Sequence, residues 1–183
     1  MDLRWPGYAV VAITIVALVG YAAFASGAVA PFLGGYDATA ADVEGADDLE
    51  EATGYEHVTV TAVDGETGEE LGHVEAAVAD TFSKRYVGLS ETDELPADRG
   101  MLFVHDEPGE YTYVMRNMSF GIDIVFVAPN GTITTIHEAP EPGPDEDGAS
   151  QEYSGQGQYV LEVNEGWMAD HGVEEGDRLE VDR

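Results

Sequence analysis

A pattern of short alternating segments separated by turn residues limits what residues 57–183 can fold into. His57–Val63 alternates valine with threonine and histidine, which is the period-two pattern of a half-buried strand. Asn130-Gly131 separates Ile122–Val127 from residues 132–137. This dipeptide is typical of a type I′ hairpin turn, because both central residues of that turn need a positive φ. The pattern therefore predicts a mainly β fold.

The rest of residues 57–183 follows the same pattern, with few interruptions. Short apolar or alternating stretches bounded by Gly, Pro or charge predict further strands at residues 71–78, 100–104, 111–115, 159–163 and 179–181. Residues 139–158 are rich in Pro, Gly, Asp and Glu, and we expect a long surface loop there. We find no internal repeat. The expected architecture is a small β-barrel-like domain, an α+β arrangement with one or two short helices.

Two short helices are expected within this domain. Asp80 or Thr81 can cap the first, on which Phe82, Tyr86 and Leu89 share one face at positions i, i+4 and i+7. Gly88 would end that helix. In the second, Asn164 would cap a single turn that carries Trp167 and Met168, and Gly172 would close it.

The N-terminal segment predicts a membrane anchor in front of this domain. No charged residue lies between Arg4 and Asp37, and residues 8–28 are almost entirely apolar. A helix of about 20 apolar residues crosses a bilayer. Arg4 and the α-amino group supply the only positive charges near the segment, which predicts a cytoplasmic N-terminus and an external C-terminal domain. The expected location is the cell membrane, with a single pass.

Two other readings of the N-terminal segment remain open. Ala23-Phe24-Ala25 has the small-residue pattern of a signal-peptide cleavage site, and cleavage there would give a secreted protein. The apolar run continues beyond that site to Phe32, which favours an anchor that is retained. A buried core helix is the third reading, and the lack of polar periodicity argues against it.

Charge excludes one class of function and suggests an adaptation. The chain has 7 Lys and Arg against 37 Asp and Glu, for a formal net charge of −30, so its surface would repel nucleic acid. The acidic residues are spread along the chain, and Lys84 is the single lysine. Such a surface is typical of a protein adapted to concentrated salt, where the screening length falls to about 3 Å. Residues 37–56 are expected to form an acidic flexible linker.

The composition gives no support for a metal or cofactor site. Cysteine is absent, which excludes disulfides, thiolate zinc sites and a catalytic thiol. The five histidines lie on separate segments, without a spacing that places two imidazoles on one face. Nucleotide-binding glycine loops and the Gly-x-Ser-x-Gly motif are also absent from the sequence. We expect no metal and no cofactor.

Several ordered motifs carry a resemblance to a known family. They are Arg-Tyr-Val-Gly-Leu-Ser at 85–90, Leu-Pro-Ala-Asp-Arg-Gly-Met-Leu-Phe at 95–103, Tyr-Val-Met-Arg-Asn-Met at 113–118, Ile-Asp-Ile-Val-Phe at 122–126, Tyr-Val-Leu-Glu-Val-Asn-Glu-Gly-Trp at 159–167, and Gly176-Asp177. Residues 58–181 thereby resemble the domain of unknown function 192 family. The resemblance implies a compact β-rich fold, often behind a signal or anchor segment, and no established activity.

The chain departs from the family pattern at three places. Ser90 stands where the family more usually has Met, and Gly121-Ile122-Asp123 stands where it has Pro-Leu-Asp. Residues 114–118 replace the family's Trp-Met-Lys-Asn-Thr, so that Val114 takes the place of the Trp. This change weakens the case for an aromatic ligand platform at position 114.

The few cations of the domain mark the candidate site. Four of the six Lys and Arg beyond residue 36 lie between Lys84 and Arg116. We expect ligand-binding residues among Arg85, Arg116, Asn117 and Asp123, which would form a cationic pocket for an anionic or polyhydroxyl compound. The structural alternative is ion pairing that holds strand register, with its candidates among Arg85, Arg99, Arg116, Asp98, Asp123 and Glu162.

The sequence is compatible with three functions. The favoured one is a membrane-anchored, non-catalytic module outside the cytoplasm that binds a small ligand or an envelope component. The second is a protein-interaction scaffold at the cell surface, which would use the acidic loop at residues 140–157. The third is a hydrolase in which two carboxylates, such as Asp98 and Asp123, act as acid and base.

Overall fold

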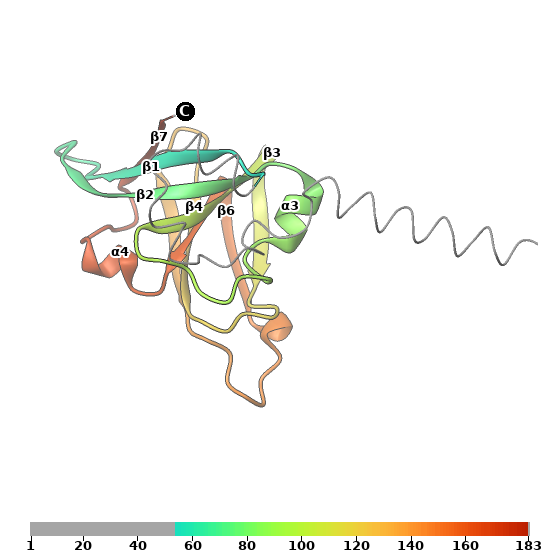
Figure 1. Cartoon of the computed structure of the whole chain (residues 1–183). Coiled ribbons are helices and arrows are strands. Elements are labelled where there is room, and N and C mark those ends of the chain that lie inside the picture. The colour runs from blue at the N-terminus through green and yellow to red at the C-terminus, as the bar shows by residue number, and fades with distance from the viewer. Residues whose placement is uncertain (1–53, 183) are drawn as a thin grey trace, which may run out of the picture.

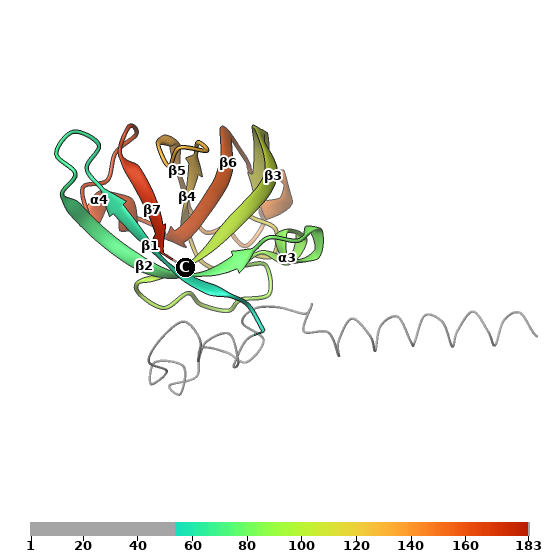
Figure 2. The same cartoon turned by 90° about the horizontal axis from the view of Figure 1, so that it is seen from above.

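A single curled sheet of seven strands forms the domain (Figures 1 and 2). The computed structural model describes residues 54–182. In these residues the strand order is β5-β4-β6-β3-β2-β1-β7, which confirms the expected mainly β class. The strands are β1 (His57–Val63), β2 (Glu70–Ala79), β3 (Arg99–Val114), β4 (Ile122–Val127), β5 (Ile133–Ala139), β6 (Glu152–Asn164) and β7 (Arg178–Asp182).

The two edge strands meet at one end, so the curled sheet forms a half-barrel that closes at that corner. Thr132 forms an isolated antiparallel bridge with Arg178. The N–H of Ile133 donates to the carbonyl of Asp177 at 2.8 Å, and the N–H of Leu179 donates to the carbonyl of Gly131 at 2.8 Å. These bonds satisfy edge groups that would otherwise be available to another chain.

Strands β2 and β3 form the one parallel pair within residues 54–182. A parallel pair needs a crossover connection, and the crossover here contains helix α3 (Phe82–Val87). Helix α3 lies beside β3, outside the sheet (Figure 1). This position makes α3 and the turn after it one wall of a pocket.

Alternating side chains bury both faces of the central strands. On one face, Leu102 and Leu161 pack with Trp167 and Met168 of helix α4 (Trp167–Asp170). On the other face, Phe103 packs with Met115, Leu89 and other buried side chains. Because side chains point alternately to the two faces of a strand, the apolar pattern of the central strands supplies both clusters.

The hairpin between β4 and β5 is confirmed, although its turn differs from the expected one. Gly131 has φ +86°, and its N–H donates to the carbonyl of Ala128 at 2.9 Å. Asn130 is not among the described residues with positive φ, so the turn is not type I′. Pro129 explains the difference, because a fixed φ near −65° favours a type I turn followed by a left-handed glycine.

The apolar face expected from Phe82, Tyr86 and Leu89 is not packed into the core as a unit. Thr81 caps the helix and Gly88 ends it, as predicted. However, Phe82 is 79% exposed and Tyr86 64% exposed, and only Leu89 is buried. The helix has no buried residue, because it stands beside the sheet at the pocket mouth instead of packing flat on it.

Two strands are longer than the sequence predicts. The stretches at 100–104 and 111–115 belong to one strand, β3, with a register irregularity between Val104 and Gly109. Strand β6 begins at Glu152, inside the segment expected to be a loop up to residue 158. At Gly155, a side chain would lie 2.4 Å from the ring of Phe126. Gly155, one of the glycines that suggested a loop, is therefore required by close packing within a strand.

The cap of α4 comes from a distant strand, and the expectation that Asn164 caps it is wrong. Gly166 is the N-cap residue and provides no side-chain hydrogen bond. Asp123 of β4 accepts from the N–H of Gly166 at 3.0 Å and from the N–H of Met168 at 2.9 Å. Burial raises the pKa of Asp123, and these two hydrogen bonds oppose the rise. Asp123 thus fixes α4 to β4.

The expected anchor at residues 8–28 lies outside the described residues, as does most of the expected linker at 37–56. Tyr55, near the end of that linker, is fully buried. Among residues 54–182, no helix is both long enough and apolar enough to span a bilayer.

Replacing Asp123 with alanine tests its capping role. Because the part-buried N–H of Gly166 and the buried N–H of Met168 would lose their acceptor, we expect Asp123→Ala to lower the free energy of unfolding by about 2 kcal/mol. Urea denaturation measures the change, with Asp170→Ala, an exposed aspartate of the same helix, as the control. Equal effects of the two substitutions would contradict the capping role.

Candidate ligand-binding site

A cavity of about 550 Å³ lies between α3, the turn that follows it, β3 and β6. Its walls include several aromatic side chains, among them Phe103, Tyr111, Tyr113 and Tyr86. The volume is that of a pocket for a small molecule. One acidic side chain, Glu162, and two arginines, Arg85 and Arg116, also line it.

Glu162 is the buried carboxyl group of the pocket. It lies on β6 between Met101 of β3 and Ile124 of β4, its partners in the register of the sheet. The residue is only 5% exposed, and burial raises the pKa of its carboxyl to about 8. Within residues 54–182, no side chain or backbone group forms a hydrogen bond or ion pair with this carboxyl. A buried polar group is normally paired, so this one is exceptional.

Tyr113 and His105 form a hydrogen-bonded pair on the β3 wall. The Tyr113 hydroxyl lies 3.0 Å from Nε2 of His105, and it donates to that atom in the tautomer with the proton on Nδ1. Burial lowers the pKa of His105, and the positive charge of Arg85 lowers it further. Burial raises the pKa of Tyr113, and so does the nearby Glu162. His105 also stacks on Tyr111, with ring centroids 3.5 Å apart.

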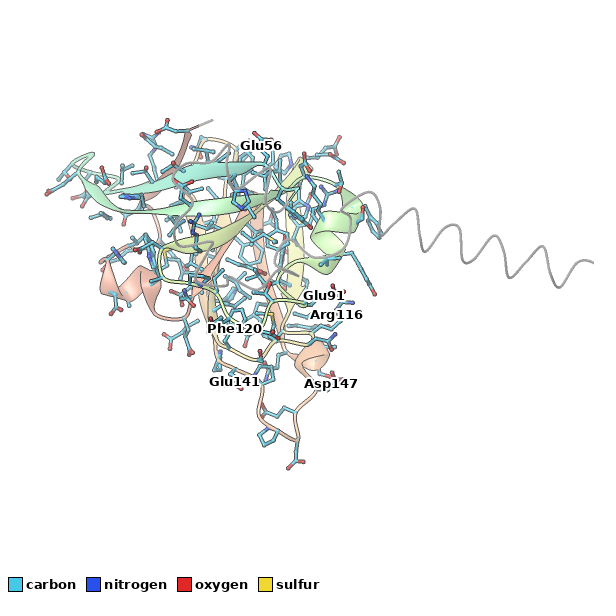
Figure 3. The ribbon with its side chains drawn as sticks, viewed as in Figure 1. Glu56, Glu91, Arg116, Phe120, Glu141 and Asp147 are labelled. Atoms are coloured by element: carbon cyan, nitrogen blue, oxygen red, sulfur yellow. The ribbon has the colours of Figure 1, made fainter. Side chains whose placement is uncertain are left out.

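Each arginine of the pocket is held by backbone carbonyls. Nη1 of Arg85 donates to the carbonyls of Asp80 at 2.8 Å and Val104 at 2.7 Å. Nη2 of Arg116 donates to the carbonyl of Tyr86 at 2.5 Å, and the guanidinium lies over the Tyr86 ring, 4.3 Å from its centroid. Figure 3 shows Arg116 on the side of the molecule that carries α3. Both side chains are thus positioned by the fold while some of their N–H groups remain available.

The structure separates the residues expected to bind a ligand. Arg85 and Arg116 both line the pocket. Asn117 is exposed and lies in a turn with φ +56°, and it is not among the lining residues. Asp123 caps α4, so its carboxylate is occupied.

The ion-pair candidates have other contacts. Glu162 lines the pocket, and Asp98 accepts a 3.4 Å hydrogen bond from the indole N–H of Trp167. Arg99 contributes a positive charge near His57, where it helps lower the pKa of that histidine after burial, the main cause. The salt bridges found among residues 54–182 join other residues, namely His73 with Glu70, Lys84 with Asp80 and Arg178 with Glu180.

The contacts of Asp98 and Asp123 also bear on the hydrolase hypothesis. Both carboxylates hold α4 and its indole in place, and neither lines the 550 Å³ cavity. In the part of the chain that the structure describes, no group of three or more His, Cys, Asp or Glu side chains is arranged to hold a metal ion.

Sequence reasoning missed the aromatic walls and the exceptional state of Glu162. Tyr111 and Tyr113 alternate along β3, which was a signal that both project from one face of a strand. Glu162 stands in an apolar run, Tyr-Val-Leu-Glu-Val, and a lone acid in such a run is a sign of a buried carboxyl. The lack of a partner for it depends on three-dimensional packing and had no signal in the sequence.

A family model matches residues 63–181, which contain every wall of this pocket. The model is that of DUF192, described as Uncharacterized ACR. The chain belongs to the DUF192 family. The resemblance seen in the motifs is therefore confirmed, and it extends over β2 to β7. No curated protein matches the chain.

Two solved structures share the DUF192 fold of this chain. One is a "putative transcription regulator" from Sinorhizobium meliloti 1021, with 30% sequence identity and a TM-score of 0.62, covering 69% of this chain and 95% of its own. The other is a protein of unknown function from Novosphingobium aromaticivorans DSM 12444, with 27% identity and a TM-score of 0.59, covering 70% of this chain and 87% of its own.

The pH dependence of stability tests the state of Glu162 in this DUF192 domain. The folded domain holds the Glu162 proton up to about pH 8, whereas the unfolded chain releases it near pH 4.5. Folded protein binds more protons between these values, so burial of Glu162 destabilises the fold increasingly as pH rises. We expect Glu162→Gln to gain stability over wild type by at most about 1.4 kcal/mol per pH unit across this window.

Urea denaturation between pH 4.5 and pH 9 measures this difference at each pH. Glu152→Gln, at an exposed position of the same strand, is the matched control and should show no such trend. A stability difference between Glu162→Gln and wild type that stays constant with pH would contradict the assignment.

Proposed function

We propose that this DUF192 protein is a membrane-anchored module outside the cytoplasm that binds a small ligand, without catalysis, in the pocket beside α3. The observation that carries the proposal is the partnerless buried carboxyl of Glu162 on the wall of an open cavity of about 550 Å³.

A buried carboxyl without a partner lowers the stability of the fold. A buried polar group without a partner costs about 1–3 kcal/mol, and more when it is charged. Leucine at position 162 would avoid this destabilisation, and glutamine would avoid the part of it that comes from ionisation. A ligand that pairs with the carboxyl would offset it, and the residue then serves binding at the expense of stability.

The arginines support a binding role in the same pocket. Of the five Lys and Arg in residues 54–182, two line this cavity. A strongly acidic chain thus keeps scarce positive charge where a ligand would lie. Ionisable groups gathered in a concave cavity with aromatic and apolar walls are typical of a binding site.

Location outside the cytoplasm is proposed from the sequence. The apolar run at residues 8–28 and the positive charge of Arg4 before it support an uncleaved anchor with the domain outside. The acidic surface supports adaptation to concentrated salt. The Sinorhizobium protein is described as a transcription regulator, and a net charge of −30 argues against direct DNA binding by this chain.

An arginine substitution tests the binding proposal. In a thermal-shift screen of small metabolites, we expect at least one compound to raise the melting temperature of wild type. The shift should disappear in Arg116→Ala, because the guanidinium lines the pocket and contributes little to the core. Arg178→Ala is the matched control, since Arg178 lies on β7, is half exposed and is absent from the cavity wall.

Retention of the shift in Arg116→Ala would contradict binding in this pocket. A screen in which no compound stabilises wild type would contradict a ligand-binding function altogether.

Protease treatment of intact cells tests the proposed topology. We expect proteinase K to degrade the domain from outside and to leave a membrane-bound N-terminal fragment, because the apolar segment would stay within the bilayer. Immunoblotting with an antibody against the domain measures this, with a cytoplasmic protein as the control for cell integrity. Survival of the domain in intact cells would contradict the topology.

A further inference from the structure

The pocket contains a carboxyl group and two guanidinium groups that are not paired to each other. Glu162 forms no ion pair, and the arginines of the pocket donate to backbone carbonyls. Hydrogen bonds of Arg85 and Arg116 within residues 54–182 use only one terminal nitrogen of each guanidinium. Each arginine therefore keeps N–H groups for a further acceptor, and the carboxyl of Glu162 keeps both oxygens.

We infer that the pocket takes a small zwitterion, whose cationic nitrogen pairs with the Glu162 carboxylate and whose carboxylate or phosphate binds Arg116 and Arg85. This inference rests on the proposed ligand-binding function and names the class of ligand. Arginine is the side chain best suited to a carboxylate or phosphate, because its N–H groups can bind both oxygens at once.

The walls between the charged groups suit a cationic nitrogen. Phe103 and Tyr113, which line the pocket, lie edge to face with centroids 5.0 Å apart, and Tyr111 adds a third ring. Aromatic faces attract a cation, and more strongly when the site is desolvated. The Tyr113 hydroxyl is already bonded to His105, so these rings offer a ligand mainly their apolar and π surfaces.

The charge of the whole chain also favours a ligand with a cationic group. At −30, the protein's field concentrates cations and repels simple anions, although concentrated salt weakens both effects. The two arginines reverse the sign only locally. A zwitterion has no net charge to be repelled, and it presents each of its ends to a group of opposite sign.

A cationic ligand and a neutral ligand predict opposite responses to pH. Without ligand, Glu162 holds a proton until about pH 8. A cationic nitrogen needs the ionised carboxylate, so its binding releases that proton and strengthens as pH rises toward 8. A sugar hydroxyl that accepts the Glu162 proton in a hydrogen bond would instead bind more weakly over the same range.

The other ionisable groups of the pocket discussed above do not change their charge between pH 6.5 and pH 8, so the pH response of binding depends on Glu162. On β3, the pKa of His105 is lowered and that of Tyr113 is raised, so His105 is neutral above pH 6.5 and Tyr113 stays neutral throughout the range. Arg85 on α3 and Arg116 after β3 stay charged at every pH in the range.

Matched pairs of probes test the inference by isothermal titration calorimetry on the full chain. Trimethylglycine is compared with 3,3-dimethylbutanoate, and choline phosphate with 3,3-dimethylbutyl phosphate. Within each pair, a quaternary nitrogen is replaced by a carbon of the same shape. We expect one zwitterion at least to bind tenfold or more tightly than its isostere, and its affinity to rise on the order of tenfold from pH 6.5 to 8.5.

Two variants assign these effects to the carboxyl group. Glu162→Gln should lose both the preference for nitrogen and the pH dependence, whereas Glu152→Gln should keep both. Titration in two buffers of different ionisation enthalpy should show proton release on binding to wild type at pH 7 and none in Glu162→Gln.

Each of three other results would overturn the inference. The first is equal affinity for zwitterion and isostere, and the second is affinity that falls as pH rises. The third is no binding of either zwitterion at 10 mM while other compounds still stabilise wild type but not Arg116→Ala. In all three cases a ligand-binding pocket could stand, whereas a screen without any stabilising compound removes the proposed function itself.

Discussion

The antiparallel ladders of β6 with β3 and β4 fix where the buried carboxyl group of the pocket lies. Glu162 stands in register between Met101 and Ile124, and both neighbours are fully buried. A shift of one residue would turn Glu162 to the opposite face and bring Leu161 into the pocket. Both faces of these strands pack against apolar clusters, so such a shift would disrupt the whole domain. The carboxyl is held in an apolar environment by the same pairing that makes the fold.

The helices depend on this sheet and serve it in different ways. Asp123 reaches from β4 to cap α4, and Asp98 holds the indole of Trp167, so the two acids stabilise the face opposite the pocket. Helix α3 is placed by the parallel crossover between β2 and β3, with Phe82 and Tyr86 largely exposed at the pocket mouth. One side of the sheet therefore carries a core that packs around Trp167 and Met168 of α4, while the other leaves the cavity of about 550 Å³ between α3 and β3.

Much of the fold followed from the sequence, because alternation and turn residues act locally. His57–Val63 and Ile122–Val127 have the predicted bounds, and the turn signal at Gly131 marked the hairpin. The failures came from tertiary packing. Gly155 was expected in a loop, but Phe126 packs directly against it, and the cap of α4 is supplied by Asp123 from 43 residues away. At the site, the scarcity of positive charge in the sequence indicated Arg85 and Arg116. The sequence could not indicate that Glu162 lacks a partner, because that depends on how the strands and helices pack around the cavity.

The most direct test of this account is the ionisation of Glu162 in the folded protein without ligand. The side-chain carboxyl carbon of ¹³C-labelled glutamate can be followed by NMR from pH 4 to pH 9, with Glu162→Gln used to assign the resonance. The account predicts one carboxyl that titrates at about pH 8, well apart from the exposed glutamates. Titration of Glu162 near 4.5, the value of an ordinary glutamate, would show that water or a protein partner already satisfies it, and the claim that the pocket is built around a partnerless acid would fail.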